Sequence, residues 1–173
     1  MKETEVILVT EDDQPVGTME KMEVHRQGLL HRAFSVFIFD SQGRMLLQKR
    51  AAGKYHGAGL WTNACCSHPY PDETTEAAAE RRLFEELGFV VPLKKAFEFI
   101  YKAKVENDLI EHEYDHVFIG NYEGEINLNE DEVSDYRFAD LSQIESDLEE
   151  QPGNFTSWFK IAFPRVVSAF KET

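Results

Sequence analysis

The segment CSHPYPDETTEAAAERRLFEELGF, at residues 66–89, is the most informative part of this sequence. It predicts a helix over residues 74–87, capped by Asp72 or Thr74. Gly88 should end the helix, because glycine readily adopts the left-handed conformation found after the last helical turn. The segment therefore joins a thiol and an imidazole at its start to a carboxylate-rich helix at its end.

Two adjacent carboxylates, Glu85 and Glu86, fall in the last turn of this predicted helix. The C-terminal end of a helix dipole repels a negative charge by roughly 0.3–1 kcal/mol, and a bound cation would offset that cost. Arg81 and Arg82 each precede a glutamate by four residues, and such exposed ion pairs contribute roughly 0.3–0.5 kcal/mol. Taken alone, the doublet favours ordinary ion pairing and leaves a metal ligand as the alternative.

The composition indicates a soluble, globular protein. The chain has 173 residues, of which 42% are hydrophobic and 29% charged, and a chain of this length buries roughly 70% of its unfolded surface as one domain. The apolar stretches are far shorter than the roughly 18–20 residues that cross a bilayer, and the N-terminus lacks a signal-peptide pattern. We therefore expect a single cytoplasmic domain with no membrane partner.

Charge is distributed unevenly along the chain. The 32 acidic and 18 basic residues give a net charge of −14, which argues against a nucleic-acid or anionic-membrane partner. Residues 41–71 contain no Asp or Glu, yet they include Arg44, Lys49, Arg50 and Lys54. This cationic window could receive a small anion. The alternative is a hairpin with solvated basic ends.

The two cysteines, Cys65 and Cys66, are neighbours in sequence. On a strand their side chains point to opposite faces, so a disulfide between them is not expected. A buried free cysteine usually behaves as a small apolar residue. His68 lies two positions after Cys66, on the same face of an extended chain, and could tune its thiol or bind a metal.

Hydrophobic patterns and turn signals predict most of the secondary structure. Strands are expected at residues 5–10, 16–19, 33–39, 44–49, 60–66, 98–105 and 110–120, with hairpin turns at 40–43 and 107–108. Helices are expected at residues 141–150 and 156–170, and Pro164 should kink or split the last one. This order of elements predicts an α/β (α+β) domain with a mixed β-sheet core flanked by helices.

The predicted strand at residues 110–120 places Glu111, Glu113 and Asp115 on one face, because side chains alternate along a strand. Two carboxylates with this spacing can converge on one cation. His31 and His68, together with His25 in an early loop, could join them, although a lone histidine is more often a surface or core residue. Three imidazoles and two carboxylates suit zinc, manganese or iron better than calcium.

Other candidate residues have simpler explanations. His112 and His116 fall on the opposite face of the same strand and His56 lies in a loop, so these three are left outside the expected metal site. Tyr101 and Trp158 are most simply aromatic core residues. Trp158 could instead present its ring face to a cationic species.

Residues 67–89 resemble the Nudix box, G-x5-E-x7-R-E-U-x-E-E-x-G-U, where U is aliphatic. The matching positions are Glu73, Arg81, Leu83, Glu85, Glu86, Gly88 and the bulky apolar Phe89. Ser67 replaces the first glycine, and Arg82 replaces the glutamate after the arginine. In Nudix hydrolases that glutamate helps to bind the metals that drive diphosphate cleavage, and arginine cannot bind a cation. The resemblance therefore implies diphosphate binding and argues against hydrolysis.

From about residue 6 to residue 170, the chain resembles the type I isopentenyl-diphosphate Δ-isomerases, which are Nudix-fold enzymes. The matching pieces are EK at 20–21 with His25, LHRAFS at 30–35, WTN at 61–63, CSHP at 66–69, YK at 101–102, EHE at 111–113 and SW at 157–158. The resemblance implies one Nudix-like domain over residues 1–173, with a core at about 30–165. It predicts no particular oligomeric state.

Carried over position by position, the resemblance implies roles for individual residues. One metal ion, Mn²⁺ or Zn²⁺, would be bound by the residues that we call the five-ligand set: His25, His31, His68, Glu111 and Glu113. Cys66 and Glu113 would be the acid/base pair, with Tyr101 assisting Glu113. Glu86 would hold a Mg²⁺ that bridges to the substrate diphosphate. The diphosphate itself would contact Lys21, Arg50, Lys54 and Arg82.

The expected reaction converts isopentenyl diphosphate into dimethylallyl diphosphate through a tertiary cation. It requires a proton donor and a proton acceptor on opposite faces of a flat substrate, and an aromatic lid such as Trp158 would shield the cation. The resemblance favours Glu113 with Tyr101 as the donor and Cys66 as the acceptor. Two alternatives are a Nudix diphosphohydrolase acting on a nucleotide or prenyl diphosphate, and a catalytically silent diphosphate-binding module.

Overall fold

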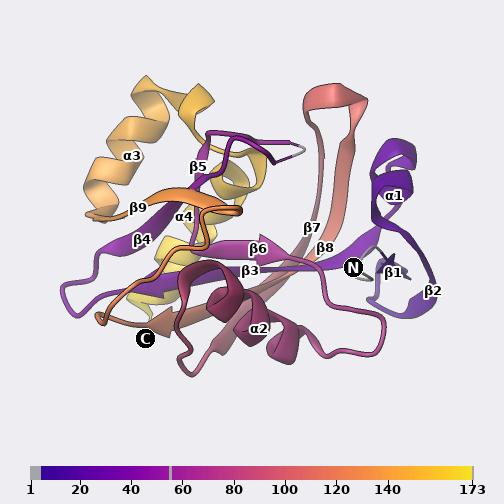
Figure 1. Ribbon diagram of the computed structural model, residues 1–173, viewed down its shortest axis with the longest axis horizontal. Coiled ribbons are helices and arrows are strands. Elements are labelled where there is room, and N and C mark those ends of the chain that lie inside the picture. Colours follow the sequence, from indigo (N-terminus) through magenta and orange to yellow (C-terminus); the bar gives the residue numbers. More distant parts are fainter. Residues whose placement is uncertain (1–4, 55, 173) are drawn as a thin grey trace.

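The computed structural model describes residues 5–54 and 56–172, which form one mixed sheet of nine strands with helices on both faces (Figure 1). The strands are β1 (Glu5–Val9), β2 (Pro15–Glu20), β3 (His31–Phe39), β4 (Met45–Arg50), β5 (Trp61–Thr62), β6 (Cys65–Ser67), β7 (Lys94–Lys104), β8 (Ile110–Asn121) and β9 (Val133–Ala139). The helices are α1 (Lys21–Gln27), α2 (Thr75–Leu87), α3 (Leu141–Glu150) and α4 (Ser157–Lys171), with 3₁₀ turns at Glu106–Asp108 and Pro152–Asn154.

Strand β3 is the centre of the sheet. It pairs in parallel with β8 and antiparallel with β6, and it also contacts β1 and β4. Its register sets His31 opposite Glu113 on β8 and Ser35 opposite Cys66 on β6. Three strands that are distant in sequence therefore bring their polar side chains to one region of the sheet.

Both faces of β3 are buried, which explains its nearly continuous apolar sequence. Phe34, Val36 and Ile38 point toward α2 and share a hydrophobic cluster with it. Phe37 and Phe39 point the other way, into a second cluster formed with α3 and α4. In Figure 1 helix α2 lies over one side of the sheet, while α3 and α4 lie toward the other.

Helix α2 confirms the prediction made from residues 66–89. It spans Thr75–Leu87; the Thr74 side chain accepts a hydrogen bond from the Ala77 amide, and Gly88 follows in the left-handed conformation with φ 78°. A Cβ atom on residue 88 would lie 2.9 Å from the backbone oxygen of Asn127, so glycine also permits the close approach of that segment. Sequence chemistry thus determines both ends of this helix.

The predicted strand at residues 60–66 is two short strands in the structure. Strand β5 pairs with β4, whereas β6 pairs with β3. Between them Asn63 donates from its side chain to the backbone oxygens of Val36 and Cys65, at 2.9 and 3.0 Å. These bonds replace the ladder contacts that a continuous strand would make.

Three further features differ from the expectations. His25 lies in helix α1, not in a loop; Glu20 caps this helix by accepting from the amides of Met22 and Glu23. Strand β9, which pairs with β4, was not predicted. Helix α4 continues through Pro164, so of the expected kink or split the split does not occur. Within the described ranges, no helix has the length and apolar character needed to span a membrane.

Candidate active site

A pocket of about 200 Å³ opens beside the polar end of β3 and β8. The residues predicted to contact substrate all line it: Lys21, Arg50, Lys54, Arg82 and Trp158. Cys66, His68, Glu111 and Glu113 line it as well. Tyr101 and Glu86 are buried beside these residues and do not form part of its wall. The structure therefore brings the candidate residues together around one space.

The side chains of the five-ligand set converge from four segments of the chain. Glu111 and Glu113 are buried on one face of β8, as the alternation predicted. His31 comes from β3, His68 follows β6, and α1 supplies His25. Four of these residues, all except Glu111, offer ligand atoms that lie within 4.8 Å of one another. A second group consists of His25, Glu111 and His56, a residue that was left outside the expected site.

Backbone carbonyl groups fix the tautomers of two imidazoles. His25 Nδ1 lies 2.7 Å from the Lys21 oxygen, and His31 Nδ1 lies 2.9 Å from the Leu29 oxygen. Because a carbonyl oxygen only accepts hydrogen bonds, each Nδ1 must carry the proton. In the neutral ring, Nε2 then presents a lone pair to the site.

These lone pairs face other acceptors. His25 Nε2 is 2.8 Å from Glu111 Oε2, and His31 Nε2 is 3.3 Å from Glu113 Oε2. His68 Nε2 lies 3.0 Å from Glu113 Oε2 and 3.2 Å from His31 Nε2. Acceptors this close in a buried space repel one another unless positive charge lies between them. Protons on the imidazoles or a metal ion must supply that charge.

The pKa values of residues in and beside the cluster are shifted by burial and by the nearby carboxylates and imidazoles. Burial and the neighbouring Glu113 raise the pKa of Glu111 to about 7. Burial opposes the charge of Glu113, but the adjacent His31 and His68 rings hold its pKa well below the usual range. Burial lowers the pKa of His56 and of His68 to about 3, which favours their neutral, ligating forms.

The residues present fit a divalent metal ion. With metal–ligand distances of about 2.0–2.2 Å, neighbouring ligand atoms are separated by roughly 3 Å. Four pairs of neighbouring atoms in the five-ligand set have such a spacing: His25–Glu111, His31–Glu113, His68–Glu113 and His31–His68 are separated by 2.8–3.3 Å. In the His25 and His31 imidazoles the Nδ1–H group also donates to a backbone oxygen, as metal-binding histidines commonly do.

The Cys66 thiol lies on the same face of the sheet, next to the cluster. It can donate to Asn63 Oδ1 at 3.2 Å or Ser35 Oγ at 3.4 Å, and the Ser35 hydroxyl donates to Asp115 Oδ2 at 2.7 Å. Burial and the nearby Asp115 raise the pKa of the Cys66 thiol. Cys65 points to the opposite face, into the cluster under α2, and both cysteines are free.

Tyr101 and Glu113, the other candidate catalytic residues, are hydrogen-bonded to each other. Tyr101, opposite Glu113 on the adjacent strand β7, donates its hydroxyl to Glu113 Oε1 at 2.6 Å. The other oxygen of Glu113 faces His31 and His68. Burial and the Glu113 charge raise the pKa of Tyr101, so its hydroxyl remains a hydrogen-bond donor.

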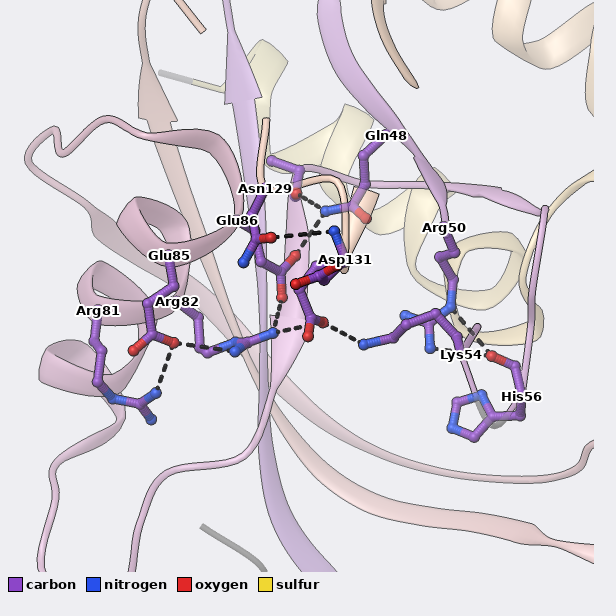
Figure 2. Close-up of polar contacts among 12 residues, drawn as sticks. Gln48, Arg50, Lys54, His56, Arg81, Arg82, Glu85, Glu86, Asn129 and Asp131 are labelled. Atoms are coloured by element: carbon purple, nitrogen blue, oxygen red, sulfur yellow. Dashed lines mark hydrogen bonds and ion pairs between the residues drawn. The ribbon is translucent and has the colours of Figure 1, made fainter. Parts of the chain in front are cut away.

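The cationic side of the pocket is a network of ion pairs (Figure 2). Arg82 contacts Glu86 and Glu85 from its own helix. Glu132 bridges Arg82 to Lys54. Burial disfavours the charge of Arg82, but Glu86 and Glu132 outweigh this effect and raise the pKa of its guanidinium.

Residues of the Nudix box also form ion pairs with one another, both within α2 and between α2 and the segment before it. Glu85 pairs with Arg81 at 3.2 Å, as expected. Arg81 also donates to Glu73, at 2.7 and 2.9 Å, and this pair links the helix to the segment before it. The second Glu86 oxygen accepts from Gln48 at 2.8 Å.

Comparisons with known proteins agree with this arrangement. The family described as NUDIX domain matches residues 29–159. Isopentenyl-diphosphate Delta-isomerase 2 of Photorhabdus laumondii is 54% identical over 155 residues, which cover 90% of this chain and 88% of the relative. Isopentenyl-diphosphate Delta-isomerase 2 of Aromatoleum aromaticum is 51% identical over 166 residues, covering 96% and 88%. The chain belongs to the isopentenyl-diphosphate Delta-isomerase family of Nudix-domain proteins.

Solved structures support the fold of this Nudix-family chain. A MutT NUDIX hydrolase from Burkholderia pseudomallei has a TM-score of 0.62 and 21% identity, covering 79% of this chain and 98% of its own. A Deinococcus radiodurans protein has a TM-score of 0.71 and 17% identity, covering 85% and 90%.

Several site residues of this isomerase-family chain were missed by sequence reasoning. Ser35, Asn63 and Asp115 surround the Cys66 thiol or connect to it, and Glu132 joins Lys54 to Arg82. The strand alternation did place Asp115 on the face of Glu113, and that signal could have linked it to the site. The sequence carries no comparable local signal for Glu132.

Removing Glu111 should release the metal. We expect the purified protein to bind about one equivalent of Mn²⁺ or Zn²⁺, and Glu111→Ala to lower the affinity at least about tenfold. Elemental analysis after dialysis measures the loss. Glu98→Ala, a change to a more exposed glutamate on the adjacent strand β7, is the control and should keep the wild-type metal content. Retention of the full metal content by Glu111→Ala would contradict the assigned site.

Proposed function

We propose that this protein interconverts isopentenyl diphosphate and dimethylallyl diphosphate, moving a double bond without hydrolysis. The observation that carries the proposal is the placement of Cys66 and Glu113 around one pocket. They come from β6 and β8, the strands on either side of β3. A flat substrate held over β3 would meet the thiol on one side and the carboxylate on the other.

The reaction moves two protons. C4 of isopentenyl diphosphate gains a proton, C3 becomes a tertiary cation, and loss of a proton from C2 gives the product. Cys66 lies beside the acceptors Asn63 and Ser35 and carries its proton at rest, whereas Glu113 is ionised. These states support Cys66 as the acid and Glu113 as the base in the forward direction, which is the reverse of the order that the resemblance favours.

The pocket walls suit the other parts of the substrate. The side chains of Lys21, Arg50, Lys54 and Arg82 would bind the diphosphate. A Mg²⁺ carried by the diphosphate would take the place of Arg82 beside Glu86, leaving the guanidinium to contact a phosphate oxygen. Trp158, which is 4% exposed, would cover the reacting carbons and keep water from the cation.

The five-ligand set would hold a divalent ion, Mn²⁺ or Zn²⁺, whose charge would keep Glu113 ionised. Tyr101 would assist Glu113 by orienting its carboxylate and by sharing the proton that this group takes up. Asp115, through Ser35, would hold the Cys66 thiol toward the pocket. Proton transfers by such positioned groups contribute typically 10²–10⁴-fold to a rate.

One assay tests this function against its two alternatives. Purified protein, Mg²⁺ and isopentenyl diphosphate are incubated in deuterated water and followed by NMR. We expect deuterated dimethylallyl diphosphate, because the acid that protonates C4 exchanges its own proton with the deuterated solvent. Release of phosphate or diphosphate would instead support a Nudix diphosphohydrolase, a function that Arg82 in the box opposes. Saturable binding with no reaction would support a silent binding module.

The two adjacent cysteines provide a matched pair of variants. Cys66→Ala removes the thiol from the pocket and should lower the rate of isomerisation by roughly 10²–10⁴-fold. Cys65→Ala changes only the apolar cluster under α2 and should retain most of the activity. The NMR assay measures both rates. Equal activity in the two variants would move the catalytic thiol elsewhere.

A further inference from the structure

His56 lies in the loop between β4 and β5, against the metal-binding cluster. Its side chain is 4% exposed, and its Nε2 is 3.5 Å from Glu111 Oε1. Its ring centroid is 6.0 Å from that of His25. One ligand atom from each of His25, His56 and Glu111 lies within 4.8 Å of the other two. His56 therefore adds a fourth imidazole to a place where the five-ligand set has three.

The backbone around His56 is anchored on both sides. Arg50 donates from Nε and Nη2 to the His56 carbonyl oxygen, at 3.3 and 3.1 Å, as Figure 2 shows. The Gly57 amide donates to Glu106 Oε2 at 3.0 Å. Gly57 has φ +65°, and a Cβ there would lie 3.1 Å from Arg50 Nε, so a larger residue would disturb this anchor.

The ring of His56 is also packed. Trp158 meets it edge to face, with the ring centroids 5.6 Å apart. Its Nε2 also faces one oxygen of the Glu111 carboxylate, whose second oxygen faces His25. The imidazole is thus held beside Glu111 by both its loop and its neighbours, and it needs little movement to reach an ion bound there.

The two groups of possible metal ligands share one residue, and this overlap favours a single ion. Both contain His25, whose Nδ1 is bonded to the Lys21 oxygen. Only Nε2 of His25 can therefore bind a metal, and its single lone pair can coordinate only one ion. A single ion beside His25 Nε2 would be next to both groups, so one ion can take ligands from each of them.

We propose that His56 is the sixth ligand of the divalent metal ion bound by the five-ligand set. Four imidazole nitrogens and two carboxylate oxygens give the six donors of an octahedral shell. The 3.5 Å between His56 Nε2 and Glu111 Oε1 exceeds the expected ligand spacing of roughly 3 Å by little. The proposal rests on the metal site of the proposed function and does not depend on the isomerase activity.

Six protein ligands have a chemical consequence. They leave no open position at which the ion could bind and activate water, as catalytic metal sites do. This suits a reaction through a carbocation, because a metal-bound water beside the cation would capture it. A shell rich in imidazole also favours transition metals over Mg²⁺ and Ca²⁺, which prefer oxygen ligands.

Water-proton relaxation of the Mn²⁺-loaded protein tests the proposal, because relaxation rises with each water bound to Mn²⁺. Measured without diphosphate, the wild type should show no coordinated water. His56→Ala should gain one, and its affinity for Mn²⁺ should fall at least about tenfold. Added imidazole should displace that water and restore the wild-type relaxation. His112→Ala, on the opposite face of β8, is the matched control and should behave as the wild type.

Equal relaxation and equal Mn²⁺ affinity in the wild type and His56→Ala would overturn the proposal, as would a coordinated water in the wild type. His56→Gln, which is closer in size, replaces His56→Ala if circular dichroism shows that the latter does not fold. A wild type that binds no Mn²⁺ would overturn the metal site itself. If isomerisation is absent while His56→Ala still gains a water, the proposed function fails and the assignment of His56 stands.

Discussion

The buried imidazoles and carboxylates at the end of β3 and β8 need a positive charge among them. His25 and His31 have tautomers fixed by backbone oxygens, so their Nε2 lone pairs face Glu111 and Glu113 across 2.8 and 3.3 Å. Leaving an unpaired charge in such a place costs several kcal/mol. A cation there would relieve this repulsion and would tie α1, β3, β8 and the segment after β6 to one point. The reactive groups around the pocket depend on that arrangement.

One face of the sheet changes from apolar to polar side chains along β3 and β8, and this change allows a charged site next to the core. Near the middle of β3 and β8, Phe37 and Val117 join the apolar cluster under α4. Toward the other end the same face carries Ser35 and Asp115, and then His31 and Glu113. Strand pairing holds both the core and the polar site in register. The apolar part supplies the rigidity that keeps the polar groups in place, and the polar part supplies the candidate catalytic groups.

Local sequence chemistry could predict much of this structure. Helix α2 and its ends followed from Thr74 and Gly88, and strand alternation placed Glu111 and Glu113 on one face. The sequence-based predictions failed where tertiary contacts determine the local structure or the position of a side chain. His25 lies in a helix of seven residues, too short to show a clear periodicity. His56 lies in a glycine-rich loop, and tertiary contacts such as the Arg50 anchor and the packing of Trp158 hold it beside Glu111.

The tautomers of His25 and His31 can be observed directly. Long-range ¹H–¹⁵N NMR of the protein loaded with diamagnetic Zn²⁺ reports which ring nitrogen carries a proton and which binds the metal. We expect protonated Nδ1 and metal-bound Nε2 in both rings, with the Nδ1 protons retained in the hydrogen bonds to the backbone oxygens of Lys21 and Leu29. Protons on Nε2 in the presence of Zn²⁺, or rings whose signals do not respond to the metal, would contradict this expectation.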